Sequence, residues 1–254
     1  MGFSSYELFS LELNKHRDYV ESQFRLVFAE EEVDGKHDDM RSAWNSVLDD
    51  DVFDGFDYVG EVSEEIVKTL RDFKNSRAVQ TLSKDGVERL NATMPLVLKA
   101  VITPNAKLDT VRRVLNVIES VTKRSVYLVL LKENPEALKH LVSLCEVSAW
   151  LAEMLVKYPA LLDQLLDERE LYSPMLSGDL KREAFKLLDE TAEDEELFMD
   201  RLRQWRHAQV FKVAAADVTQ NVPIMKVSDY LTWIAETVLE VATEFAWRLS
   251  LIHI

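Results

Sequence analysis

The acidic segment 49–61, which reads DDDVFDGFDYVGE, is the first place where residue types and spacing could bind a cation. Four of its residues match positions 1, 5, 6 and 12 of a calcium-binding EF-hand loop: Asp50, Asp54, Gly55 and Glu61. Position 3 is Val52, which has no oxygen to donate, and position 8 is Asp57, where an apolar side chain normally packs. We therefore interpret the segment as a solvated acidic loop between helices, with calcium binding as the weaker alternative.

A basic cluster later in the chain offers a different chemistry, the binding of anions. Its members are Arg201, Arg203, Arg206, His207 and Lys212. Helical spacing places Arg203, Arg206 and His207 on one face. We take Arg203, Arg206 and Lys212 as candidate contacts to an anionic ligand or partner. The alternative is that these charges are solvated or paired with nearby glutamates.

Other reactive side chains have simpler interpretations. Lys226 and Ser228 superficially resemble a Ser-Lys pair, but residues two apart on a helix do not face each other, so we expect Ser228 to cap the helix after Pro223. His140 is expected in the core or on a helix surface, because no further metal ligands converge on it. Cys145, the only cysteine, lies in an apolar run and is expected to be buried. One cysteine excludes an internal disulfide and fits a reducing cytoplasm.

The composition predicts an all-α protein. Only six Gly and six Pro occur in 254 residues, and apolar residues mostly lie three or four apart. The hydrophobic content of 47% is ordinary for a folded protein. A formal charge of −15 repels phosphate backbones and argues against nucleic-acid binding. No apolar run is long enough to cross a membrane. We therefore expect a cytoplasmic protein.

The periodicity predicts long amphipathic helices in two packed helical-bundle subdomains, with the boundary at Pro104. One apolar face is expected for the run from Val210 to Val218, which contains Phe211 and Val213. The expected helices are 6–32, 40–48, 63–73, 83–102, 108–131, 135–145, 148–158, 179–188 and 191–218, with a last one beginning at residue 228.

Four strings in the second half carry a family resemblance: ALKHLVSLC at 137–145, KYPALLDQLLDERELY at 157–172, AQVFKVAAADV at 208–218 and PIMKVSDYLTWIAE at 223–236. The string DGVERLNATMPLVL at 85–98 extends the similarity toward the N-terminus. Together and in this order, they resemble the bifunctional glutamine synthetase adenylyltransferase/adenylyl-removing enzyme of bacteria. The resemblance covers most of the chain.

The resemblance implies two nucleotidyltransferase-like halves, each with a helical segment beside its catalytic sheet. Residues 1–103 resemble the helical domain that follows the adenylyl-removing core, and residues 104–248 resemble the region that leads into the adenylyltransferase core. The final LSLIHI, residues 249–254, departs from the family and is expected to be a non-native tail. The family's Gly-Ser-Asp-x-Asp-type element, whose carboxylates hold Mg²⁺ against nucleotide phosphates, has no match in this chain, so no catalytic residue is carried over.

The resulting expectation is a central helical scaffold, inactive alone, of an enzyme that attaches AMP from ATP to glutamine synthetase and removes it by phosphorolysis. No cofactor is expected in this chain, and Mg²⁺ and ATP are implied for the parent enzyme. Glutamine synthetase and the PII signal protein are the implied partners, and the candidate cations would face nucleotide phosphates or an acidic patch of glutamine synthetase. The alternative is a stand-alone acidic helical protein-interaction module.

Overall fold

The computed structural model describes residues 35–48, 64–103, 106–191 and 193–252, which form helices and connecting turns without a strand. The all-α prediction is therefore confirmed. The expected helix 6–32, the cap at Ser63 and the acidic segment with Asp50, Asp54, Gly55 and Glu61 lie outside these residues. Within the described part of the chain, no helix is both long enough and apolar enough to cross a membrane.

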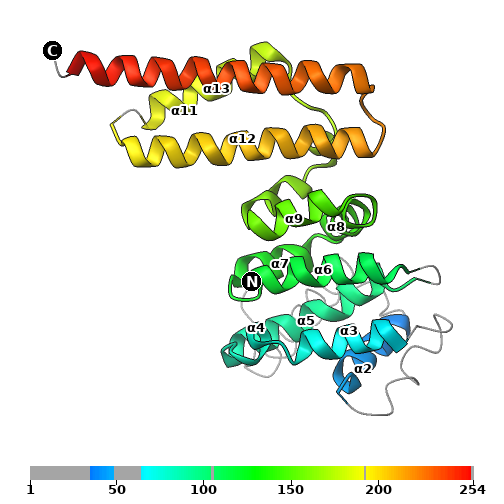
Figure 1. Ribbon diagram of the computed structural model, residues 1–254. Helices are drawn as coiled ribbons and strands as arrows, with labels where there is room; N and C mark the ends of the chain where they lie inside the picture. Colours follow the sequence, from blue (N-terminus) through cyan, green and yellow to red (C-terminus); the bar gives the residue numbers. More distant parts are fainter. Residues whose placement is uncertain (1–34, 49–63, 104–105, 192, 253–254) are drawn as a thin grey trace, which may run out of the picture.

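The helices are arranged as successive layers along one axis (Figure 1). The elements at one end and in the middle are α2 (Gly35–Ser46), α3 (Glu64–Lys74), α4 (Arg77–Gln80), α5 (Lys84–Val101), α6 (Leu108–Val121), α7 (Ser125–Glu133), α8 (Pro135–Val147) and α9 (Ala149–Lys157). A 3-10 helix, η2 (Pro159–Leu165), and the short α10 (Glu168–Leu171) lead to the other end. That end consists of α11 (Ser177–Thr191), α12 (Glu195–Val218) and α13 (Ile224–Ile252).

The predicted helix 108–131 is wrong, because two helices occupy this range. The Thr122 hydroxyl donates to the Glu119 carbonyl at 2.9 Å, and the Arg124 amide donates to the Val121 carbonyl at 2.8 Å, which closes α6 in a tight turn. The break lets the two apolar faces pack in different directions. Helix α6 packs mainly on α9, whereas α7 packs mainly on α5.

The buried side chains form two clusters. The first runs continuously from α2 through α10, so it crosses residue 104 without interruption. The second is made by α11, α12 and α13. The buried residues therefore divide between Leu171 and Leu180, and the first cluster spans Pro104 because α5 packs on α7 and α3 packs on α6. Which family region each part corresponds to stays a prediction.

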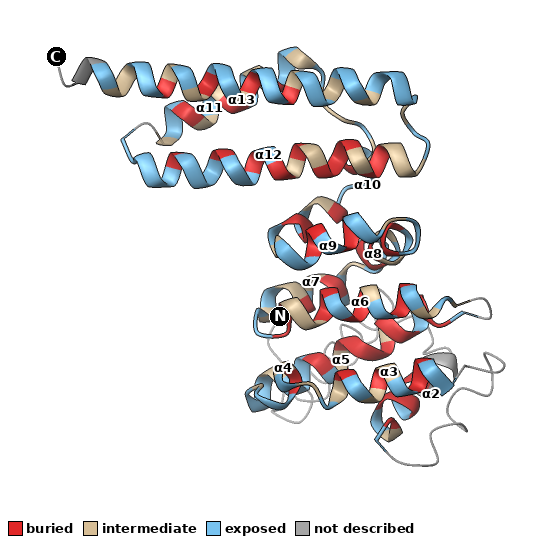
Figure 2. Ribbon diagram, in the orientation of Figure 1, coloured by how far each residue is buried: buried red, intermediate tan, exposed pale blue. Residues whose placement is uncertain are grey.

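Helix α12 contributes to both clusters and joins them. Phe211 and Ala215 belong to the first cluster, whereas Val213 belongs to the second. The single apolar face predicted for 210–218 is therefore wrong: residues two apart point to nearly opposite sides of a helix. Figure 2 shows this helix between the layers, with buried residues along its length.

The turn around Pro223 forms as a helix, a short connection and a second helix, as predicted. The Asn221 amide donates to the Ala216 carbonyl at 2.9 Å and the Gln220 amide to the Asp217 carbonyl at 2.9 Å, a Schellman motif that ends α12. Pro223 then directly precedes α13, which begins at Ile224. The predicted cap at Ser228 is wrong, because this residue lies inside α13.

Candidate functional site

A cleft of about 590 Å³ lies where the two clusters meet. Helix α12 forms one wall, and η2 and the segment beside it form another. One residue of α10 and two of α11 complete the lining, together with the residue before α7 and the last residue of α9. Among the lining side chains, Arg124, Lys157, Arg201 and Lys212 are cationic, and Asp163, Glu170 and Glu183 are acidic.

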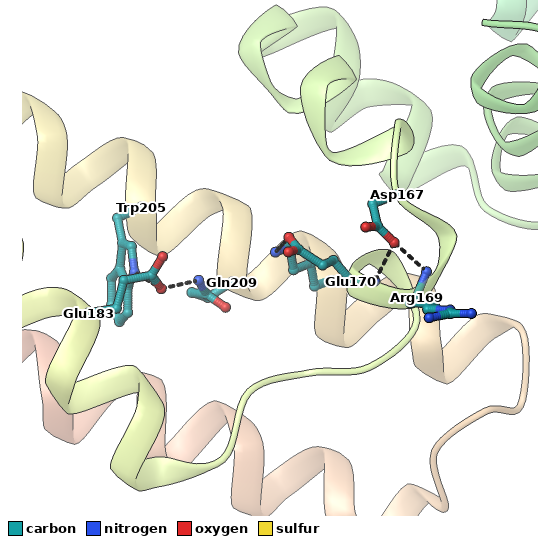
Figure 3. Close-up of polar contacts among 7 residues, drawn as sticks. Asp167, Arg169, Glu170, Glu183, Trp205 and Gln209 are labelled. Carbon is teal, nitrogen blue, oxygen red and sulfur yellow. Dashed lines mark hydrogen bonds and ion pairs between the residues drawn. The ribbon is translucent and has the colours of Figure 1, made fainter.

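The α12 side of the cleft is held by buried polar side chains. Glu183 accepts hydrogen bonds from Trp205 Nε1 at 2.9 Å and from Gln209 Nε2 at 3.2 Å. Figure 3 shows this carboxylate reaching from α11 to Gln209 on α12. One carboxylate oxygen therefore satisfies two N–H groups that burial would otherwise leave without an acceptor.

Lys212 is the most enclosed cation of the cleft, with 5% of its surface exposed. Its Nζ lies 3.4 Å from Glu170 Oε2, and the Glu170 side chain is itself 68% exposed. Asp167 caps α10 by accepting from the backbone amides of Arg169 and Glu170, which fixes the turn that presents this carboxylate (Figure 3). The buried ammonium thus depends on one long contact to a solvated partner.

His207 lies on the cleft floor in a positive environment. Its ring stacks on Tyr158 with centroids 3.9 Å apart, and Lys157 Nζ lies 5.3 Å from the centroid of the same tyrosine. Burial lowers the pKa of His207, and the charges of Arg206, Lys157 and Arg203 lower it further. Arg206 Nη2 donates to His207 Nε2 at 2.9 Å, so the histidine serves as a neutral acceptor.

The three candidate contacts from the sequence occupy different surroundings. Lys212 lines the cleft, whereas Arg203 and Arg206 are exposed beside it and are not lining residues. Arg203 pairs with Asp200 one turn earlier on α12. The structure brings Lys212 together with Arg124 and Lys157, which sequence reasoning missed, because these cations come from separate helices and no spacing rule links them.

The other reactive side chains have structural roles. His140 is half-buried, and its Nδ1 donates to the Leu165 carbonyl at 3.1 Å. Cys145 is buried as predicted, and burial raises the pKa of its thiol to about 12. Lys226 pairs with Asp229. Among the described residues, no group of three or more His, Cys, Asp or Glu side chains could hold a metal ion.

The sequence alone predicts that the five tryptophans pack helices together, but the structure places them in different surroundings. Trp44 is buried, and its Nε1 donates to Asn91 at 2.8 Å, and Trp205 is also buried. Trp150 and Trp247 are 49% and 62% exposed, so for these two the expectation is wrong.

Comparison with known proteins decides the family. The model of the family described as glutamate-ammonia ligase adenylyltransferase matches residues 138–253. The bifunctional glutamine synthetase adenylyltransferase/adenylyl-removing enzyme of Thioalkalivibrio sulfidiphilus is 38% identical over 253 residues, covering 94% of this chain. The chain belongs to this family. The corresponding enzymes of Pseudomonas putida and Nitrosococcus oceani are 36% and 37% identical over 98% and 100% of the chain.

The chain spans about a quarter of the length of these adenylyltransferase relatives, 26% for the T. sulfidiphilus enzyme and 27% for that of N. oceani. The family match covers all but three residues of α8 and continues through α13, so most of the cleft lies within it. It also extends into the last residues, 249–253, although the expectation of a non-native tail stays a prediction.

Proposed function

We propose that this chain is the central helical scaffold of an enzyme that attaches AMP from ATP to glutamine synthetase and removes it by phosphorolysis. The observation that carries the proposal is that nearly the whole chain is similar to a segment of such enzymes that makes up about a quarter of their length. The layered helices support it, because a continuous stack can hold two flanking parts of an enzyme at a fixed separation (Figure 1).

The chemistry of AMP transfer belongs, in this proposal, to other parts of the longer enzyme. Nucleotidyl transfer uses carboxylates that hold Mg²⁺ against phosphates, and the Gly-Ser-Asp-x-Asp-type element that supplies them in the family has no match in this sequence. We therefore assign Mg²⁺ and ATP to the parent enzyme and derive no catalytic step from this chain. Glutamine synthetase, the PII signal protein and a cytoplasmic location are part of the same proposal.

A direct assay tests whether the chain is inactive alone. Purified chain is incubated with ATP, Mg²⁺ and glutamine synthetase, and AMP incorporation is followed by mass spectrometry. We expect no transfer. AMP attached at a rate above that without the chain would contradict the assignment of catalysis to other parts.

A chimera tests the scaffold function itself. This chain replaces the matching segment of the Pseudomonas putida enzyme, and adenylylation and phosphorolytic removal are measured. We expect both activities to be retained. A second chimera carries Ala214→Pro, which breaks α12 in its interior, and should lose coordination of the two activities, whereas Thr243→Ala on the exposed side of α13 should not. Normal activities with α12 broken would refute a scaffold role.

The candidate contacts Arg203, Arg206 and Lys212 can be tested in the same chimera. Charge reversal at the exposed pair, Arg203→Glu and Arg206→Glu, should raise the KM for glutamine synthetase if these cations face an acidic patch. Unchanged adenylylation kinetics would mean that they are ordinary surface charges.

A further inference from the structure

The cleft gathers unpaired cations in a strongly acidic chain. The formal net charge is −15, yet Arg124, Lys157 and Arg201 line one cleft from three separate elements. Within the described residues, none of the three forms an ion pair, and Lys157 instead lies over the Tyr158 ring. Such cations favour an anionic ligand, because a low-dielectric wall strengthens their combined field.

The three carboxylates of the cleft offset only part of the charge of its four cations, which leaves one positive charge in excess. Glu183 accepts two hydrogen bonds from α12, and Glu170 contacts Lys212. Burial raises the pKa of the Asp163 carboxyl. Burial lowers the pKa of His207, and the charges of Arg206, Lys157 and Arg203 lower it further.

Lys212 provides a binding group at one end of the cleft. An ammonium has three N–H donors, and the single contact at 3.4 Å uses one of them. Only 5% of Lys212 is exposed, so water has little access to its ammonium group. A carboxylate entering the cleft would supply this group with a second acceptor. Charge-assisted hydrogen bonds of this kind are the strong ones.

The length of the cleft selects the kind of anion. Arg201 and Lys212, eleven positions apart on α12, both line it, which corresponds to about 16 Å at the rise of a helix. An extended peptide covers that distance with about five residues, whereas one small diacid or diphosphate does not. Gln164 and Gln204 also line the cleft. Their amides can both donate to and accept from a peptide backbone, while a phosphate chain offers acceptors only.

We propose that this cleft binds an extended acidic peptide segment of a partner protein. Carboxylates of the segment contact Lys212 and the rim cations Arg124, Lys157 and Arg201, and its backbone bonds the glutamine amides. The proposal goes beyond the scaffold function, because it requires no adenylyl transfer. If the chimera loses its activities, the peptide-binding proposal is unaffected. If the cleft binds no acidic peptide, the scaffold proposal is likewise unaffected.

Fluorescence anisotropy with the full chain tests it. The probe is a fluorescein-labelled acetyl-hexaglutamate peptide, and the matching hexaglutamine peptide is the neutral control. We expect saturable binding of hexaglutamate that weakens as salt rises and no binding of hexaglutamine. The double variant Arg124→Gln/Arg201→Gln, at exposed positions, should bind at least tenfold more weakly, and so should Lys212→Met.

A charge-matched variant separates the cleft from the general surface. Lys99→Gln/Arg112→Gln removes two exposed cations outside the cleft, and it should bind hexaglutamate as the unmodified chain does. Circular dichroism checks that each variant is folded. The proposal would be overturned if both double variants weakened binding equally or if hexaglutamate did not bind. It would also be overturned if tripolyphosphate bound more tightly than the peptide.

Discussion

Thr237 is a buried hydroxyl without a partner on the face of α13 that packs against the second cluster. It is 0% exposed, and within the described part of the chain its Oγ1 has no hydrogen-bond partner. Burial without a hydrogen bond leaves the lost hydration uncompensated. This residue therefore weakens the fold it lies in.

Replacing Thr237 by valine, which has a similar shape, should raise the free energy of unfolding by about 1 kcal/mol, because it removes the unpaired polar atom. Urea denaturation followed by circular dichroism measures the change. Thr243→Val is the control: its hydroxyl is exposed and donates to the Leu239 carbonyl at 2.7 Å, so no gain is expected. A destabilised Thr237→Val variant would contradict the prediction.

His207 should make stability depend on pH. Its pKa is lower in the folded protein than the ordinary histidine value of 6.5, so below pH 6.5 the unfolded chain binds the proton first. The free energy of unfolding should therefore fall as the pH drops from 6.5 through the folded pKa. Above 6.5 the histidine is neutral in both states and contributes no pH dependence.

Denaturation of the unmodified chain and of His207→Gln at several pH values between 7.5 and 5 measures this contribution. The variant should lose less stability over the interval, because glutamine keeps an acceptor for Arg206 without titrating. Parallel pH dependences in the two proteins would show that His207 does not carry the effect.

The end of α12 illustrates how one backbone conformation decides where an element stops. Gln220 has φ of 59°, in the left-handed region, at the position where the Schellman motif most often has glycine. A side chain with a Cβ atom is strained there, whereas glycine is not. The left-handed backbone conformation that connects α12 to α13 is therefore formed by a residue that destabilises it locally.

Gln220→Gly should stabilise the chain by about 0.5 to 1 kcal/mol, since relief of this strain exceeds the added flexibility of the unfolded chain. Thermal and urea denaturation measure the change. Glycine at Thr219, the C-cap residue of α12, should instead destabilise, because the Thr219 hydroxyl donates to the Ala215 carbonyl at 2.7 Å. Destabilisation by both substitutions would argue against strain at Gln220.

Cooperation between the two ends of the molecule depends on α12. Phe211 and Ala215 pack into the first cluster, and Phe198 and Val213 pack into the second. Figure 2 shows the layers that this helix joins. Rigid attachment of one end to the other is what a scaffold requires, and it is also what fixes the walls of the cleft.

Phe211→Ala should destabilise the chain by about 3 to 5 kcal/mol, because it leaves a cavity at a fully buried aromatic position. Hydrogen exchange measured by mass spectrometry should show faster exchange in α8 and α9 as well as in α11 and α13. Leu239→Ala, at a 68% exposed site on α13, is the control without effect. Faster exchange confined to α8 and α9 would mean that the two clusters open independently.

Local pattern was enough for much of the fold. Ser148 accepts from the Leu151 amide at 3.3 Å, so this helix start was correctly predicted. The predicted start of the long helix at Thr191 is wrong, because Thr191 ends α11 and Asp194 caps α12 by accepting from the Leu197 amide at 2.9 Å. The burial of Cys145 and the turn at Pro223 also followed from neighbouring residues. The break after α6 did not, because apolar spacing continues through it and only the partners of α6 and α7 differ.

The sequence by itself determined the helical class, most helix boundaries and the family resemblance, since each depends on residues close together in the chain. Only the tertiary structure decided that packing continues past Pro104, that α12 faces two clusters and that Lys212 lies with Arg124 and Lys157 in one cleft. The physical reason is that these features depend on contacts between distant segments, whose geometry no local periodicity contains.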